Sequence, residues 1–514
     1  MSDKITFTLD GLEVEALPGQ SIWEVAKGGG LVIPHLCHKD HPGYRSDGNC
    51  RACMVEIEGE RTLAASCIRV PTEGMVVKTD TQRATMARDM VMEMLVTDQP
   101  EPEVAHDRSS HFWDLAEEGS RFPKLEEGRI PLLDDSHVAM SVNLDACISC
   151  GLCVRACREV QVNDVIGMAG RGADAYPVFD MGDDMGASTC VGCGECVQAC
   201  PTGALMPSSV TPGAGVGDSR DYDEEVESVC AFCGVGCQIS IKVKDGAVKY
   251  VEGINGPANE GRLCVKGRFG YDYIHHQHRL TTPLIRREGA PKGLNVNPDT
   301  WAETFREATW EEALDVAANG LKGRGREVAG FGSAKCTNEE AYLFQKFIRQ
   351  GFGHNNVDHC TRLCHASSVA ALIENVGSGA VTATFNEIEN ADVAIVIGAN
   401  PLENHPVAAT YFKQFTKRGG KLIVMDPRGQ ALKRFSTHML QVRPGADVAM
   451  LNAIMHVIAE EGLVDEQYIA GYTENWEAER EHLKGFPPEK MAEICGIEAE
   501  ELRAVARLWA GSKA

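Results

Sequence analysis

The sequence predicts a multidomain chain of mixed α+β and α/β class, in which small cysteine-rich domains precede a doubly wound α/β domain. Three observations predict this class. The chain has 514 residues, too many for one hydrophobic core. Sixteen of its 20 cysteines stand in closely spaced groups before residue 265. From about residue 300, helical patterns alternate with short apolar strands, which is typical of a parallel sheet covered on both faces.

Composition narrows the class of function. The formal net charge is −24, and such an acidic surface repels a phosphate backbone, so we expect no nucleic-acid partner. The amino terminus lacks the basic and apolar regions of a secretion signal, and no run of 18 apolar residues occurs. We therefore expect a cytoplasmic protein without a membrane span. In such a protein, many cysteines indicate metal binding or redox chemistry rather than disulfides.

The first predicted domain covers residues 1–80. Alternating strands turn at Asp10-Gly11, a helix begins at Ser21, and a further strand follows in "RACMVEIEGE". The cysteines after the helix look like those of a β-grasp 2Fe–2S ferredoxin domain, in which four thiolates hold two irons: Cys37, Cys50, Cys53 and Cys67. The alternative is a four-cysteine zinc site, although zinc loops usually pair two CxxC knuckles and one is present here.

Residues 81–137 are predicted to form a mostly helical connector without cysteine. Its histidines, His106 and His111, lie in a charged helical stretch, where such side chains are more often solvated or capped than bound to metal.

Residues 138–208 carry the most specific pattern, C-x2-C-x2-C-x3-C, twice. In ferredoxins with two clusters, the fourth cysteine of each run ligates the other cluster. We therefore assign one 4Fe–4S cluster to Cys147, Cys150, Cys153 and Cys200, and the other to Cys190, Cys193, Cys196 and Cys157.

A third cysteine group lies in a predicted domain at 223–279, after a stretch rich in Pro, Gly, Ser and Asp that indicates a linker. The G-A-G-V-G of that stretch follows no strand, so it is not a nucleotide loop. The group provides thiolates for a 4Fe–4S cluster or, on spacing alone, for zinc: Cys230, Cys233, Cys237 and Cys264. Lys266 is then either a solvated lysine or a cation between this cluster and its electron-exchange partner.

The last predicted domain, residues 280–514, is the α/β domain. A helix with Thr309 as N-cap and Glu312 in a capping box, a short buried strand in "REVAGFGS" and the helix "TNEEAYLFQKFIRQGFG" open it. Two apolar strands, "ADVAIVIGANP" and "GKLIVMDPRG", then run into polar loops. Ligands lie beyond the carboxyl ends of parallel strands, so these loops predict a nucleotide-like site. The alternative is that their polar residues only cap the loops. The residues of the predicted site are Asn400, Glu403, Asn404, His405, Asp426, Pro427 and Arg428.

Taken together, "CAFCGVGC", "GRLCVKGRFGYDYIHH", "CTRLCH", "NEIENADVAIVIGANPLENHP" and "DPR…RPGAD" make the chain resemble the large subunit of cytoplasmic, NAD-dependent, molybdenum-containing formate dehydrogenases. Its amino-terminal part is similar to the iron–sulfur subunit of respiratory NADH dehydrogenase. The resemblance implies that Cys364 ligates molybdenum or tungsten, that His365 stands beside it, and that Lys266 lies between the proximal cluster and a pterin. It also implies that the loops at 400–405 and 426–428, with Asp447, hold a bis-molybdopterin guanine dinucleotide.

The chain also departs from these relatives. Their additional cluster, held by one histidine and three cysteines, has no counterpart, since His106 is followed at the same spacings by Ser110, Trp113 and Gly119. Family large subunits are longer, so the second half of the pterin cradle and the arginine that orients formate are expected beyond Ala514. No flavin or NAD site is found, which implies a separate diaphorase subunit and a small 2Fe–2S subunit as partners.

The expected activity is oxidation of formate to CO2 at the metal held by Cys364, with His365 taking or relaying the proton. Cys360 and Cys364 could instead be ordinary buried thiols one helical turn apart. We take Cys336 and Cys495 as structural. Two other functions stay open: an electron-transfer scaffold with an empty pterin domain, and a nitrate reductase. The cysteine–histidine pair favours formate dehydrogenase, because nitrate reductases resemble it but have methionine after the cysteine.

Overall fold

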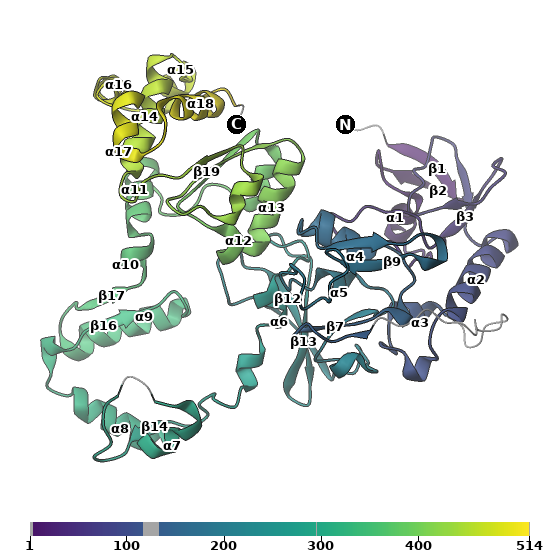
Figure 1. Cartoon of the computed structure of the whole chain (residues 1–514), viewed down its shortest axis with the longest axis horizontal. Helices are drawn as coiled ribbons and strands as arrows, with labels where there is room; N and C mark the ends of the chain where they lie inside the picture. Colours follow the sequence, from purple (N-terminus) through teal and green to yellow (C-terminus); the bar gives the residue numbers. More distant parts are fainter. Residues whose placement is uncertain (1–3, 117–132, 294–295, 513–514) are drawn as a thin grey trace. The chain divides into compact units, whose positions relative to one another are not determined.

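The computed structural model describes residues 4–116, 133–293 and 296–512 (Figure 1). These residues form two compact units, one made of Met1–Gly270 with Phe385–Ala514 and the other of Tyr271–Thr384. Within the described residues, no helix is long and apolar enough to cross a membrane.

The first domain of the larger unit is a five-stranded sheet in the order β2-β1-β5-β3-β4 with one helix. Asp10 and Gly11 turn the first hairpin with positive φ angles, and Ser21 and Glu24 form a complete capping box at the helix, as predicted. Phe7, Val55 and Val77 are almost fully buried around the helix, as the β-grasp prediction requires. The elements are β1 Ile5–Leu9, β2 Leu12–Ala16, α1 Ile22–Gly28, β3 Met54–Ile57, β4 Ala64–Ala65 and β5 Val76–Lys78.

The connector and the double-cluster domain follow. In the latter, two short helices carry the cysteine runs, and a three-stranded sheet in the order β10-β7-β6 packs with them. The elements of both are α2 Gln82–Thr97, η1 Pro102–Val104, α3 His111–Leu115, β6 Leu133–Asp134, β7 Met140–Asn143, α4 Leu152–Arg155, the π-helical turn η3 Ala156–Val160, β8 Ile166–Ala169, β9 Tyr176–Phe179, α5 Glu195–Ala199 and β10 Leu205–Pro207.

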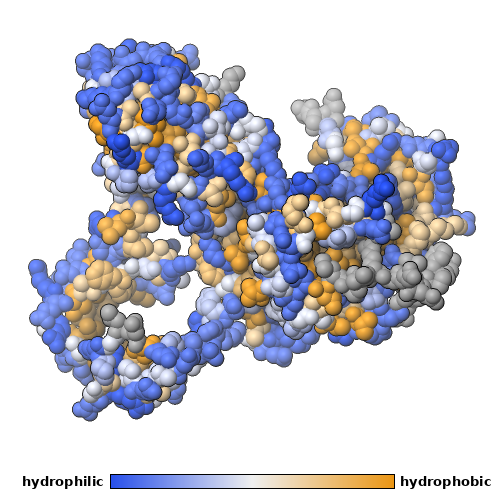
Figure 2. Space-filling model, viewed as in Figure 1, coloured by the Kyte–Doolittle hydropathy of each residue, from blue (hydrophilic) through white to orange (hydrophobic). Residues whose placement is uncertain are grey.

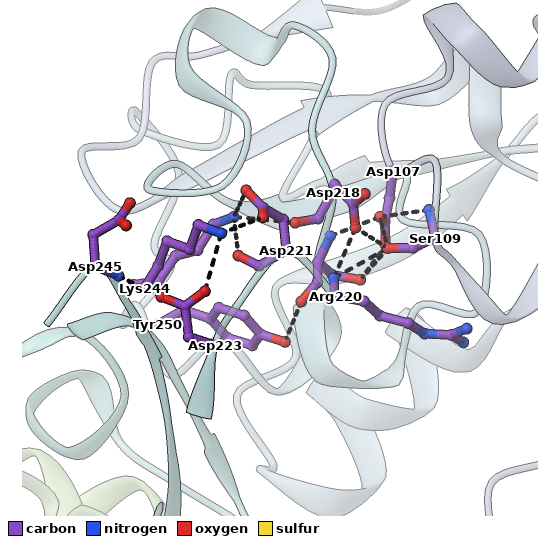
Figure 3. A network of polar contacts seen from close by, with 11 residues as sticks. Asp107, Ser109, Asp218, Arg220, Asp221, Asp223, Lys244, Asp245 and Tyr250 are labelled. Carbon is purple, nitrogen blue, oxygen red and sulfur yellow. Dashed lines mark hydrogen bonds and ion pairs between the residues drawn. The ribbon is translucent and has the colours of Figure 1, made fainter. Parts of the chain in front are cut away.

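The stretch predicted to be a linker is packed, so that prediction is wrong. Thr211 is fully buried, and a polar network ties residues 218–223 to the connector and to the next sheet (Figure 3). The Ser219 hydroxyl donates to Asp107 at 2.8 Å, and the Tyr250 hydroxyl donates to the Ser219 carbonyl at 2.8 Å. The serines and aspartates that resemble loop residues in the sequence instead bind segments more than 20 positions away, such as Asp107 and Lys244.

The third cysteine group sits on a three-stranded antiparallel meander in the order β11-β12-β13, followed by one short helix. Its elements are β11 Glu224–Val229, β12 Gln238–Lys244, β13 Ala247–Gly253 and α6 Val265–Phe269.

The remaining part of the larger unit is the predicted doubly wound α/β structure. Strands β18, β19 and β20 pair in parallel, and successive residues of β19 face opposite layers. Leu422 and Val424 pack with Phe415 of α13, whereas Ile423 and Met425 pack with helices α14, α17 and α18. The elements are β18 Val393–Ile397, α12 Pro401–Asn404, α13 Pro406–Lys417, β19 Lys421–Met425, β20 His438–Leu440, α14 Asp447–Glu460, α15 Glu466–Tyr472, α16 Trp476–Leu483, α17 Pro488–Cys495 and α18 Ala499–Ala510.

The smaller unit contains two two-stranded ladders and several helices. Thr309 caps α8 by accepting from the Glu312 N–H, but the Glu312 carboxylate pairs with Arg306, so the predicted capping box is half formed. Its elements are β14 Leu284–Arg286, α7 Trp301–Thr304, β15 Phe305–Glu307, α8 Trp310–Leu321, β16 Gly330–Gly332, α9 Asn338–Lys346, the π-helical turn η9 Phe347–Gly351, β17 Val357–His359, α10 Thr361–Cys364 and α11 Ala366–Val376.

The strand β16 differs from the prediction, which made it buried. Gly330 is covered by Ile348, but Phe331 is 81% exposed. Apolar side chains such as Leu343 gather on the surface of this unit (Figure 2). The β16–β17 ladder is covered at Gly330, where Phe344 of α9 and Ile348 of the turn η9 lie against it.

Arg155 joins the 2Fe–2S-type domain to the double-cluster domain, and its substitution tests how much this contact stabilises the fold. Its side chain is 2% exposed, pairs with Asp47 and donates to the Cys37 carbonyl at 2.7 Å. Arg45 pairs with the same Asp47 at 2.6 Å, but its side chain is 65% exposed.

We expect Arg155→Met to lower the free energy of opening of residues 37–50 by about 3 kcal/mol, because it breaks a buried ion pair. The control Arg45→Met removes two exposed pairs, with Asp47 and with Glu159, each worth under about 1 kcal/mol. Amide hydrogen exchange measures both, and equal losses in the two variants would contradict the account.

Candidate functional site

The first cysteine group converges in the loop between α1 and β3 and at β4. Cys37 and Cys50 exchange backbone N–H···S bonds of 3.4 and 3.3 Å. Hydrogen bonds from the Cys50 and Cys67 thiols hold the pKa of Cys37 at about 2, and a bond from Cys67 lowers the pKa of Cys53 to about 7. Three of the four thiols are buried, and Cys50 is half-buried. The four sulfurs therefore form one donor set.

In the double-cluster domain, the last cysteine of each run lies near the first three cysteines of the other run, and we call the two resulting sets crossed. Burial and then negative charge at Cys200 raise the pKa of Cys150, although these residues belong to different runs. Burial and then the thiolates of its own run raise the pKa of Cys196, and Cys157 of the other run adds to the rise. The structure thus brings two sets together: Cys147, Cys150, Cys153 and Cys200, and Cys190, Cys193, Cys196 and Cys157.

Backbone donors and apolar walls surround these sulfurs. Ser149 and Gly192, both with positive φ, donate N–H groups to the sulfurs of Cys147 and Cys190 at 3.4 Å. A cavity lined by all four cysteines of the first set has apolar walls made of Leu144, Ile148, Met168, Pro177, Pro201, Ala204 and Leu205. Such a donor set, with N–H groups aimed at sulfur and no disulfide, fits a 4Fe–4S cluster.

The third group forms at the turn between β11 and β12 and at the start of α6. Burial, followed by negative charge at Cys230, Cys264 and Cys233, raises the pKa of Cys237 to about 12. The cation of Lys266 acts in the opposite direction on Cys230. Four thiols are again close enough to repel one another when ionised, which fits a cluster whose irons compensate their charge.

The four groups follow one another through the larger unit. Cys37 of the first group acts electrostatically on Cys150 of the next, and Cys153 acts on Cys196. A Cβ atom on Gly192, in the second run, would lie 3.2 Å from Val265, the residue after Cys264. The order in space is therefore the 2Fe–2S-type group, the two crossed groups and the group at α6.

The predicted dinucleotide loops meet at one edge of the parallel sheet. Ile397 pairs with Met425, and Met425 pairs with Leu440, so the polar residues after the three strands share that edge. The Arg428 N–H donates to Asp426 at 2.7 Å. Asp447 is at the start of α14, beyond the third strand.

Gln430, which the sequence did not single out, joins two of these loops. Its amide donates to the Ala399 carbonyl at 2.8 Å and to Asp426 at 3.1 Å. The Gln430 Oε1 and Asn400 Oδ1 atoms are buried and accept no hydrogen bond from any described residue. Two buried acceptors without donors are costly unless a ligand supplies N–H groups.

Lys266 connects the α6 group with the first of these loops. Its ammonium donates to the Glu403 carbonyl, 3.3 Å away in α12, and the lysine is half-buried rather than free in solvent. Glu403 and Asn404 are exposed in α12, and His405, between α12 and α13, is half-buried.

Cys364 and His365 belong to the smaller unit. Both are exposed, with Cys364 ending α10 and His365 preceding α11. Cys360, one turn away, is also exposed, with its sulfur 3.8 Å from His359 Nδ1. The reading of Cys360 and Cys364 as buried core thiols therefore does not hold, whereas Cys495 is fully buried and Cys336 is exposed.

The expectation that His106 is solvated or capped is wrong, because its side chain is buried between two domains. Its ring is 1% exposed, with Nδ1 2.7 Å from the Gly203 carbonyl and Nε2 3.2 Å from the Ser141 hydroxyl. Ser110 is also buried, Trp113 lies in α3, and Gly119 lies outside the described residues. His106 fastens the connector to the double-cluster domain. His111 is half-buried and contacts the His35 carbonyl at 2.9 Å.

Comparison with known proteins agrees with these four regions. Residues 2–82 match a 2Fe-2S iron-sulfur cluster binding domain, 146–204 a 4Fe-4S dicluster domain, 223–276 the molybdopterin oxidoreductase Fe4S4 domain and 279–498 molybdopterin oxidoreductase. The described structure is thus made of iron–sulfur ferredoxin domains and a molybdopterin oxidoreductase domain, which confirms the predicted fold class.

Several curated relatives are formate dehydrogenases by name. Putative formate dehydrogenase YrhE of Bacillus subtilis is 31% identical over 98% of this chain and 55% of its own length. Formate dehydrogenase H of Escherichia coli is 37% identical over 56% of this chain and 41% of its own length. The alpha subunit of an F420-dependent formate dehydrogenase of Methanocaldococcus jannaschii is 39% identical over 56% and 41%. The chain spans about half the length of the relatives it matches.

Two glycines in the cysteine loops provide a test of the cluster fit. Gly194 has φ +67°, and a Cβ atom there would lie 2.1 Å from Arg268. Gly236 has φ +71° but no atom within 4 Å of its added Cβ.

We expect Gly194→Ala to lose about four irons per chain, because the loop that carries Cys193 and Cys196 must move. The control Gly236→Ala carries backbone strain of about 1 kcal/mol alone and should keep its iron. Iron and sulfide analysis of the two purified variants measures this difference. A full iron content in Gly194→Ala would contradict the assignment of a 4Fe–4S cluster to Cys193 and Cys196.

Proposed function

We propose that the chain is the catalytic subunit of a cytoplasmic formate dehydrogenase, which oxidises formate to CO2. The observation that carries the proposal is the unbroken series of thiol groups that ends at Lys266, whose ammonium binds the first dinucleotide loop. The names of the relatives support formate as the substrate.

The proposed ligands of one 2Fe–2S and three 4Fe–4S clusters are the four thiol sets. Cys364 is the proposed protein ligand of molybdenum or tungsten. When bound, these clusters supply one-electron transfer, and the metal with two pterin dithiolenes supplies a two-electron acceptor.

The dinucleotide is proposed to lie on the carboxyl edge of the sheet. The unpaired acceptors Asn400 Oδ1 and Gln430 Oε1 suit the N–H groups of a guanine base. The proposed contacts are Asn400, Glu403, Asn404, His405, Asp426, Pro427, Arg428 and Asp447.

Lys266 and His365 are the proposed polar groups of the reaction. The Lys266 ammonium lies between the Cys230 thiol and the Glu403 carbonyl, where its charge favours electron uptake nearby. Cys364 must be ionised to bind metal, and the adjacent His365 can accept or relay the proton that formate releases.

The electron acceptor is proposed to be a flavin- and NAD-binding diaphorase subunit, reached through a small 2Fe–2S subunit. The F420-dependent relatives match 56% of this chain, whereas the relatives that match 98% of it are not named for F420. The complex isolated with its partners should therefore reduce NAD+ with formate, and reduction of F420 alone would contradict this part.

Metal analysis tests the proposed cofactors. The purified protein should contain about 14 irons and about one molybdenum or tungsten per chain, as the four thiol sets and Cys364 require. Full iron without either heavier metal would instead support an electron-transfer scaffold.

Cys364→Ser tests the metal ligand against its matched neighbour. A serine hydroxyl is a poor ligand for a soft site, so the variant should lose formate oxidation by at least about a hundredfold while keeping its iron. Cys360→Ser, one helical turn away and also exposed, should keep both the formate oxidation and the iron.

Assays with formate and with nitrate complete this experiment. Formate oxidation preserved in Cys364→Ser would refute the ligand. If the unaltered protein reduces nitrate and does not oxidise formate, the proposed function is wrong and a nitrate reductase takes its place.

A further inference from the structure

Lys413 is a buried cation that the proposed reaction does not use. It lies on α13 of the molybdopterin domain and is 4% exposed. Its ammonium donates to the Gln161 carbonyl at 2.5 Å and to Asn163 Oδ1 at 2.9 Å. Both partners belong to the double-cluster domain, just after the helix that carries Cys157. A lysine is seldom fully buried unless its charge is paired or coordinated.

Asn163 relays this contact to a thiol of the second crossed set. Its side-chain amide donates to the Cys193 sulfur at 3.8 Å while its carbonyl oxygen accepts from Lys413. Burial lowers the pKa of Lys413 to about 8, and negative charge at Cys193 and Cys157 opposes that fall. The ammonium therefore lies within electrostatic reach of two thiols of this set.

The neighbours of Lys413 on α13 fix it in place. Gln414 donates to the Glu159 and Val160 carbonyls at 3.1 Å, and Lys417 donates to the Arg158 carbonyl at 2.9 Å. These carbonyls end the π-helical turn η3, where the backbone lacks partners of its own. Three side chains of one helix thus cap the helix end next to Cys157, so the ammonium is held rather than mobile.

We propose that Lys413, acting through Asn163, is a positioning residue that raises the reduction potential of the cluster held by Cys157, Cys190, Cys193 and Cys196. This inference rests on the cluster ligands of the proposed function. Reduction adds one electron, which formate supplies, and breaks no bond, so the reduced state carries one more negative charge. A fixed cation in a weakly screened interior stabilises that state.

The test is a redox titration of the purified protein with dithionite, followed by electron paramagnetic resonance. Lys413→Met removes the charge and keeps most of the stem. We expect the reduced-to-oxidised ratio of one 4Fe–4S cluster to fall at least about tenfold at fixed poise, which is about 59 mV for one electron. The other clusters, whose sulfurs do not accept from Asn163, should shift less.

Two further variants separate charge from structure. Lys413→Arg keeps the cation and should keep the potential near that of the unaltered protein. Lys421→Met removes an exposed lysine of the same domain, at the start of β19, where solvent screens its charge, so the potential should stay unchanged.

An unchanged potential in an iron-replete Lys413→Met overturns the inference. If that variant loses its iron, Asn163→Leu decides, because it keeps the lysine and removes the link to Cys193; an unchanged potential there also overturns it. If the unaltered protein shows no 4Fe–4S signals, the result contradicts the proposed function rather than the role of Lys413 alone.

Discussion

Crowded thiols in buried sites are the constraint on which the larger unit depends. Four sets of four cysteines are held close together, and all of these cysteines are free thiols. Ionising several sulfurs in one apolar pocket is unfavourable unless cations compensate the charge. Burial, with neighbouring thiolates added to it, raises the pKa of Cys196 and of Cys237 for this reason. Iron would supply that compensation, and backbone N–H groups already donate to the sulfurs of Cys37, Cys147 and Cys190.

The rest of the unit keeps the thiol sets in order. Arg155 ties the first set to the second, and His106 fastens the connector to the double-cluster domain. The helix α13 extends this arrangement into the α/β domain through Lys413. Each junction uses a buried polar group that donates to or accepts from backbone of another domain, which gives orientation as well as stability.

Local signals in the sequence predicted much of this structure. The Asp10-Gly11 turn and the Ser21 capping box depend on neighbouring residues, and the apolar runs of β18 and β19 report burial directly. The cysteine spacing likewise indicated which thiols of different runs lie near one another, such as Cys150 and Cys200. The position of Asn400 and Asp426 at one edge of the sheet was predictable from their place after parallel strands.

Contacts between distant segments were not predictable in the same way. The stretch at 207–225 has the composition of a linker, yet its Ser219 and Asp218 bind Asp107 and Ser109 of the connector. Gln430, Asn163 and Lys413 carry no motif, since their roles come from partners that the fold brings close. A buried lysine on an otherwise amphipathic helix is the signal that could have identified Lys413.

Mössbauer spectroscopy of the protein enriched in 57Fe and purified without oxygen tests the central claim most directly. The account predicts that about one iron in seven belongs to a 2Fe–2S centre and that the others belong to 4Fe–4S centres. Isolated tetrahedral iron, or zinc in place of iron at the four thiol sets, would contradict it.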